Sequence, residues 1–178
     1  MDEDKRAVIE YGVDILVSTV LTTVAILILG LLYGKIVITL IYLFVTIPIR
    51  SNGGGYHAKT HWGCTLLQCI SFTIVCGLTI IMNQYVSLAT LGIVYVLEIL
   101  LVVLRAPAEH PNNPLDSDSK KKMKLKCLVW TVLIMAISMI TFDYFPECAI
   151  AASLSIGIAG LSMLMSFLNK SEDKETAT

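Results

Sequence analysis

Six long apolar runs constrain this chain more than any other feature of its sequence. They cover residues 15–32, 36–49, 64–82, 86–104, 127–142 and 148–168. A helix needs roughly 20 residues to cross the hydrocarbon core of a bilayer. With 56% hydrophobic and 15% charged residues, the chain also has too little charge to cover a soluble globule of its size. We therefore predict an all-α fold, a polytopic membrane helical bundle of about six transmembrane helices in one domain spanning residues 1–178.

Two of these runs need separate arguments. The run 36–49 is short and is interrupted near its end by Pro48, so it either re-enters the membrane or extends backwards while Lys35 snorkels to the surface. The first run follows a lead that is as acidic as it is basic, and no small-residue cleavage site follows it. We therefore expect a mature helix there and no removable signal peptide.

The positions of the positive charges predict the orientation. If all six runs span, every Lys and Arg except Lys35 falls on one side, among 13 in total. The positive-inside rule assigns that side to the cytosol. The loops 50–63 and 105–126 and both termini are therefore expected to be cytosolic. The five cysteines are expected to remain reduced, without a disulfide framework.

The segment between the second and third runs combines a histidine, a cysteine and a glycine run. From Arg50 to Cys64 it reads RSNGGGYHAKTHWGC. A cysteine is a useful nucleophile only as thiolate, and a nearby imidazole or a helix N-terminus stabilises that form. Both devices are available here, so we predict that chemistry takes place at Cys64.

Two histidines compete for the role of base. In one continuous helix His57 would lie about 10 Å from Cys64 along the axis, so it serves the cysteine only if the chain folds back. Gly53, Gly54 and Gly55 supply the backbone freedom for that. His61 is three residues from Cys64, the spacing of neighbours on a helix face, and local geometry slightly favours it.

Plainer interpretations exist for the same residues. A glycine-rich turn at a membrane surface is usually a connector, and a cysteine that opens a transmembrane helix is usually a small apolar residue. A zinc site formed by His57, His61 and Cys64 is a further alternative, although the loop lacks a fourth ligand or a water-activating carboxylate.

The order Arg50, Gly55, His57, Cys64 resembles that of the accessory gene regulator B family, membrane-embedded cysteine endopeptidases that mature quorum-sensing peptides in Gram-positive bacteria. Chain length, six apolar segments, a cytosolic site loop and a proline-containing loop followed by lysines agree with the resemblance. One departure is Asn113 before Pro114, where the family pattern has a basic residue. This departure affects the expected substrate contacts of that loop.

The resemblance implies a mechanism without a metal or other cofactor. Cys64 would attack a peptide carbonyl of a small precursor, with His57 as general base and then acid. The precursor would carry an amphipathic leader and an acidic C-terminal tail. Release of that tail would leave a thioester, and an internal cysteine or serine of the precursor would then close a thiolactone or lactone. Under this interpretation His61 has only a supporting or structural role.

Several other residues have two interpretations each. Arg50 either binds a substrate carboxylate or polarises the site, or it anchors the chain at the membrane surface. The lysines of the second large loop either hold anionic lipid and set topology or capture the acidic precursor tail; they are Lys120, Lys121, Lys122, Lys124 and Lys126. Glu98 is an acid within an apolar run, a functional candidate by default, and it either orients His57 or bonds a polar partner such as Gln68.

Two rival functions remain open at this stage. The chain is either a non-enzymatic peptide exporter, for which Glu98 and the glycine loop are the motivation, or an intramembrane metalloenzyme. Nothing in the sequence resembles a nucleic-acid surface. Gly157, Gly160 and Ser162 offer small-residue packing surfaces that would suit helix association in a homodimer.

Overall fold

The computed structural model describes residues 3–54, 61–106 and 117–175, with the backbone alone at 3–11, 14–15, 61 and 167–175. The described residues form six α-helices and no strand, which confirms the all-α prediction. The helices are α1 (Glu3–Leu32), α2 (Ile36–Gly53), α3 (His61–Met82), α4 (Leu88–Arg105), α5 (Ser117–Thr141) and α6 (Pro146–Glu175).

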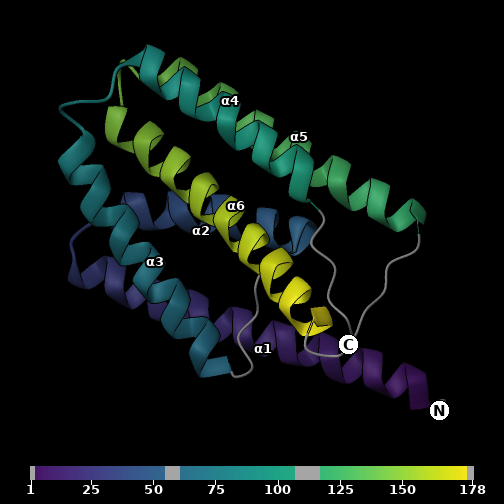
Figure 1. Ribbon diagram of the computed structural model, residues 1–178. Coiled ribbons are helices and arrows are strands. Elements are labelled where there is room, and N and C mark those ends of the chain that lie inside the picture. Colours follow the sequence, from purple (N-terminus) through teal and green to yellow (C-terminus); the bar gives the residue numbers. More distant parts are fainter. Residues whose placement is uncertain (1–2, 55–60, 107–116, 176–178) are drawn as a thin grey trace.

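Each helix runs antiparallel to the one before it, so the chain alternates between two ends of the bundle (Figure 1). Short connections at residues 33–35, 83–87 and 142–145 lie together at one end, which we call the turn end. The last residues of α2 and α4 and the first residues of α3 and α5 lie at the opposite end. We call it the site end, because it contains Cys64.

Helices α2 and α6 form the centre of the bundle. Two buried apolar clusters meet on them, one shared with α4 and α5 and the other shared with α1 and α3. The buried face of α6 consists largely of small residues, among them Ala151, Ser155 and Ala159. Small side chains let helix backbones approach closely, which is how helices pack in a membrane, where water provides no apolar driving force.

The composition of the helices fits a multi-pass membrane protein. Five helical segments are long and apolar enough to cross a bilayer: Ile36–Gly53, Trp62–Met82, Leu88–Arg105, Ser117–Thr141 and Pro146–Ser166. The apolar part of α1, Leu16–Leu32, is shorter. Large apolar side chains cover the outside of the bundle, as at Leu66, Ile93 and Ile140, where lipid tails replace water as the solvent.

Helix α2 passes through Pro48 and ends at Gly53, so the predicted break of the second run is wrong. Proline removes the N–H that would otherwise bond the carbonyl four residues earlier. That carbonyl belongs to Phe44, and the indole Nε1–H of Trp130 on α5 donates to it at 3.3 Å. The rings of Phe44 and Trp130 pack with centroids 4.9 Å apart. A neighbouring helix therefore satisfies the carbonyl that Pro48 leaves without a partner.

The two large loops are shorter than the sequence suggested. Helix α3 begins at His61 and α5 begins at Ser117, so the expected loops 50–63 and 105–126 lose residues to the adjoining helices. Residues 120–126 consist of lysine, methionine and leucine, which are all good helix formers. This helix propensity, and not charge alone, determines the structure of the segment, so α5 begins before the lysines.

The small residues that were assigned to a dimer surface are used inside the bundle. Gly160 leaves no room for a Cβ against Leu101 of α4, and a Cβ at Gly157 would lie 3.2 Å from Oε1 of Glu98. Ser162 is buried. The close approach of α6 to α4 explains these glycines within one chain, so they give no support to a homodimer.

Candidate active site

Arg50 and Cys64 come together at the site end. Cys64 lies in the first turns of α3 with 8% of its surface exposed. The Nη2 group of Arg50, in the last turn of α2, lies 3.9 Å from the Cys64 sulfur and donates to it. A guanidinium and the positive end of a helix dipole both favour the thiolate form of a cysteine. The structure thus brings a cation and a helix N-terminus to the predicted nucleophile.

Gly54 fixes the direction in which the chain leaves α2. Its backbone has φ +71° and ψ −160°, a region of conformational space that is essentially restricted to glycine. Its N–H donates to the Arg50 carbonyl at 3.0 Å and so closes the last turn of the helix. Gly54 was predicted as a supporting residue because glycine has a flexible backbone. In the structure it adopts a conformation open to glycine, and this conformation sets the direction in which the chain leaves α2 beside Arg50.

Gly53 lets the end of α2 pack closely against α5 and α6. A Cβ at this position would clash with Met163 of α6 and would lie 3.0 Å from the Cys127 sulfur of α5. The Cys127 thiol also donates to the Ile49 carbonyl at 3.9 Å. The end of α2 is therefore packed tightly against both helices, which fixes the position from which Arg50 extends.

Two further polar contacts hold α3 beside the nucleophile, and sequence reasoning did not identify either. The hydroxyls of Thr22 on α1 and Thr65 are 3.0 Å apart. Tyr42, a fully buried residue of α2, donates to the side-chain oxygen of Gln68 at 3.1 Å. Gln68 was considered from the sequence only as a partner of Glu98, and its contact with Tyr42 joins two helices that the sequence does not place side by side.

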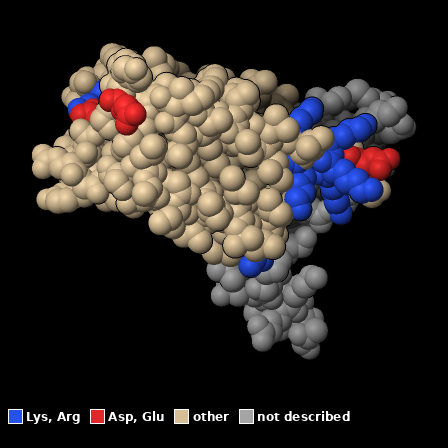
Figure 2. All heavy atoms as spheres, turned by 90° about the horizontal axis from the view of Figure 1, so that it is seen from above, with Lys and Arg blue, Asp and Glu red and all other residues tan. Residues whose placement is uncertain are grey.

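The lysines lie on the first turns of α5, in the helix and not in a loop, at the same end of the bundle as Cys64. Figure 2 shows Lys and Arg gathered at this end, while a small mixed group of charges lies at the other. The contact between Cys127 and Ile49 joins the end of this lysine segment to the residue preceding Arg50. The basic surface and the Arg50–Cys64 pair are therefore neighbours.

Glu98 does not point toward α3. It is 7% exposed, and its Oε1 accepts a hydrogen bond from Ser153 of α6 at 3.1 Å. The suggested partner Gln68 is bonded to Tyr42 instead. Its other oxygen, Oε2, is buried without a hydrogen-bond partner among the described residues. Glu98 therefore bonds a polar partner and connects α4 to α6, but that partner is Ser153 and not the suggested Gln68.

Two of the predicted residues lie outside the described part of the chain, namely His57 and Gly55, and of His61 only the backbone is described. The choice between the two histidines therefore remains a prediction from the sequence. The zinc alternative depends on the same side chains and has the same status.

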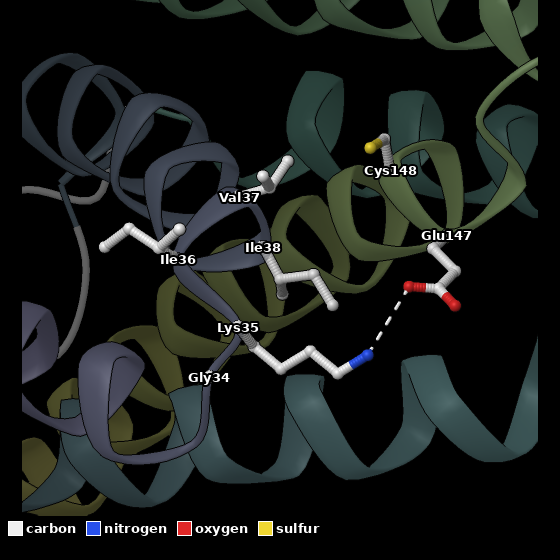
Figure 3. Close-up of a pocket in the computed structure, with 7 residues that line it drawn as sticks. All are labelled: Gly34, Lys35, Ile36, Val37, Ile38, Glu147 and Cys148. Atoms are coloured by element: carbon white, nitrogen blue, oxygen red, sulfur yellow. Dashed lines mark ion pairs between the residues drawn. The ribbon is translucent and has the colours of Figure 1, made fainter.

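A pocket of about 200 Å³ lies at the turn end, far from Cys64 (Figure 3). Residues 34–38 form one side of it, and Glu147 and Cys148 of α6 form the other. The ammonium group of Lys35 lies 3.6 Å from Oε2 of Glu147, and Asn83 donates to the other oxygen of this carboxylate at 3.5 Å. These contacts join the connections at residues 33–35 and 83–87 to the start of α6.

The family model of Accessory gene regulator B matches residues 1–168. The chain is 30% identical over 179 residues to an AgrB-like protein of Clostridium perfringens strain 13, covering 94% of this chain and 84% of that protein. It is also 31% identical over 113 residues to the accessory gene regulator protein B of Staphylococcus intermedius, covering 63% and 58% of the two chains.

No solved structure matches this chain. The family match extends over nearly all the residues that form the bundle, including α2 and α3 with Arg50 and Cys64. The chain belongs to the accessory gene regulator B family.

Proposed function

We propose that this protein is a membrane-embedded cysteine endopeptidase that removes the C-terminal tail of a small quorum-sensing precursor peptide and promotes cyclisation of the remainder. Membership of the family supports a role in processing the peptide of an accessory gene regulator system. The observation that carries the cysteine mechanism is the contact between the Arg50 guanidinium and the sulfur of Cys64, at 3.9 Å in the first turns of α3.

The reaction has two acyl-transfer steps. The Cys64 thiolate attacks the carbonyl carbon of the scissile peptide, a C–S bond forms, and the carbonyl electron pair moves to oxygen. Collapse of this intermediate breaks the C–N bond, and the departing amine takes a proton from the imidazolium of His57. An internal thiol or hydroxyl of the precursor then attacks the thioester. Its proton passes to the imidazole, the C–S bond to Cys64 breaks, and the cyclic product leaves.

The membrane location serves the second step. Water competes with the internal nucleophile for the thioester, and a site that limits water access favours ring closure over hydrolysis. Cys64 is largely buried, which agrees with this requirement. The basic surface of α5 is suited to hold the acidic tail of the precursor by charge attraction, and the same lysines would bind anionic lipid on the cytosolic leaflet of a Gram-positive cell membrane.

Replacement of the nucleophile tests the proposal. We expect Cys64→Ala to abolish processing of the precursor by enzyme reconstituted in vesicles, because no acyl-enzyme can form. Cys69→Ala is the matched control, because Cys69 is a thiol on the same helix with a half-buried side chain, and this variant should retain processing. Mass spectrometry of the unmodified enzyme should show Cys64 carrying the truncated peptide.

Three results would contradict the proposal. One is intact processing in Cys64→Ala. Another is movement of uncleaved precursor across sealed vesicles by the unmodified enzyme, which would favour the exporter. The third is loss of processing after dialysis against a chelator, with restoration by zinc, which would favour the metalloenzyme.

A further inference from the structure

A polar seam connects α2 to α3 beneath the candidate nucleophile. Direct packing between these two helices is sparse, yet two polar contacts bridge them, from Arg50 to Cys64 and from Tyr42 to Gln68. Gln68 and Tyr42 are both buried, at 9% and 0% exposure. A buried amide in a membrane helix is costly unless its polar atoms have partners, so its presence here needs a reason.

Gln68 lies one helical turn after Cys64 on α3. Residues four apart on a helix lie on the same face with Cβ atoms about 5–6 Å apart. Side chains on a helix lean toward its N-terminus, which for Gln68 is the direction of Cys64. The terminal amide of a glutamine is long enough to cover most of this separation.

Tyr42 determines which end of the amide is available. The Tyr42 hydroxyl donates to the Oε1 atom of Gln68 at 3.1 Å and also lies 3.5 Å from the Gln68 backbone carbonyl. The Oε1 atom of Gln68 therefore faces α2, because it accepts a hydrogen bond from Tyr42 on that helix. In the part of the chain that the structure describes, the amide nitrogen of Gln68 donates to no acceptor. Two N–H donors therefore remain on an amide whose orientation is fixed.

We infer that Gln68 is a catalytic residue whose side-chain N–H group donates to the oxyanion that forms when Cys64 attacks the precursor carbonyl, and that Tyr42 is the positioning residue that orients its amide. This inference rests on the proposed function. A fixed donor directed at the place where negative charge develops stabilises the transition state with little reorganisation. The positive end of α3 acts on the same oxygen.

Gln68→Met tests the donor. Methionine keeps an unbranched side chain of similar length and is compatible with an apolar surrounding, but it has no N–H group. We expect the rate of Cys64 acylation by the precursor to fall by roughly 100-fold in a single-turnover measurement, the size typical of losing one oxyanion donor. Gln84→Met is the matched control, because Gln84 is exposed in the turn after α3, and it should acylate at the unmodified rate.

Alkylation of Cys64 by iodoacetamide separates catalysis from structure. This reaction needs the same thiolate but forms no oxyanion, so Gln68→Met should alkylate at the unmodified rate while its acylation is slow. Tyr42→Phe keeps the Gln68 amide but removes the hydroxyl that orients it. The rate of Cys64 acylation should therefore fall in this variant, but by less than in Gln68→Met. The rate of alkylation should again be unchanged.

Unchanged acylation in Gln68→Met would overturn the inference. So would an equal loss of acylation and alkylation, because Gln68 would then act on the sulfur or on the fold. Processing that survives Cys64→Ala would contradict the proposed function itself, whatever Gln68→Met does.

Discussion

At the scale of single residues, Arg50 is predicted to control the reactivity of Cys64. From the sequence, Arg50 is either a membrane anchor or a residue of the active site. The 3.9 Å contact of its Nη2 group with the Cys64 sulfur favours the second interpretation. A hydrogen bond to a charged group contributes about 1.5–3 kcal/mol. Because about 1.4 kcal/mol corresponds to a factor of ten, we expect Arg50→Gln to slow alkylation of Cys64 by at least roughly tenfold.

Two variants sharpen this prediction. Arg50→Lys keeps the charge but loses the planar fork, so its alkylation rate should lie between those of Arg50→Gln and the unmodified enzyme. Arg105→Gln is the matched control, because Arg105 lies in the last turn of α4 and should leave the rate within about twofold. Equal alkylation rates for Arg50→Gln and the unmodified enzyme, measured by mass spectrometry against time, would contradict a role for Arg50 at the sulfur.

At the scale of elements, α2 reaches the site only because α5 compensates for Pro48. The Phe44 carbonyl accepts from the Trp130 indole at 3.3 Å. In Trp130→Phe this carbonyl loses its partner, and we expect a loss of about 1–3 kcal/mol in the free energy of unfolding. In the Pro48→Ala background the new N–H of residue 48 can bond Phe44 within the helix, so the same tryptophan replacement should cost less.

A double-mutant cycle measures the difference between these two costs. Unfolding in mixed micelles of increasing denaturing-detergent content, followed by circular dichroism, would give the four free energies. An equal cost of Trp130→Phe in both backgrounds would show that the tryptophan contributes packing alone and that the carbonyl is satisfied in another way.

At the scale of the whole molecule, the distribution of charge predicts the orientation in the membrane. Among the described side chains, the site end carries Arg50, Arg105 and the five lysines of α5, whereas Lys35 is the one cation of the turn end. The positive-inside rule therefore predicts that the site end faces the cytosol. Exposed aromatic residues in two of the turns, Tyr85 and Tyr144, suit the opposite membrane surface, since aromatic rings favour the headgroup level.

Thiol labelling tests this orientation. In a chain whose five native cysteines are replaced by alanine, Asp143→Cys and Asp118→Cys place exposed thiols at the turn end and the site end. A membrane-impermeant maleimide should label the first variant in intact cells and the second only after permeabilisation. The reverse pattern would contradict a cytosolic site and, with it, capture of a cytosolic precursor.

The sequence by itself determined the fold class and indicated the candidate nucleophile. Long apolar runs can only be buried in lipid or in a large core, and a chain of this length with so little charge cannot form such a core in water. Cys64 stood out because it follows a glycine run and two histidines at the start of such a run. Both inferences depend on local composition and spacing, which one sequence displays in full.

Only the tertiary structure decided which residues share the site. Neither the Arg50–Cys64 contact nor the pairing of Tyr42 with Gln68 can be derived from spacing, because each joins two helices whose relative rotation is set by packing of the whole bundle. For the same reason Glu98 pairs with Ser153 instead of Gln68. The continuation of α2 through Pro48 likewise depends on a tryptophan far along the chain. Hydrophobic periodicity identifies a helix and its buried face, but the partner of each buried polar group is fixed by contacts between distant segments.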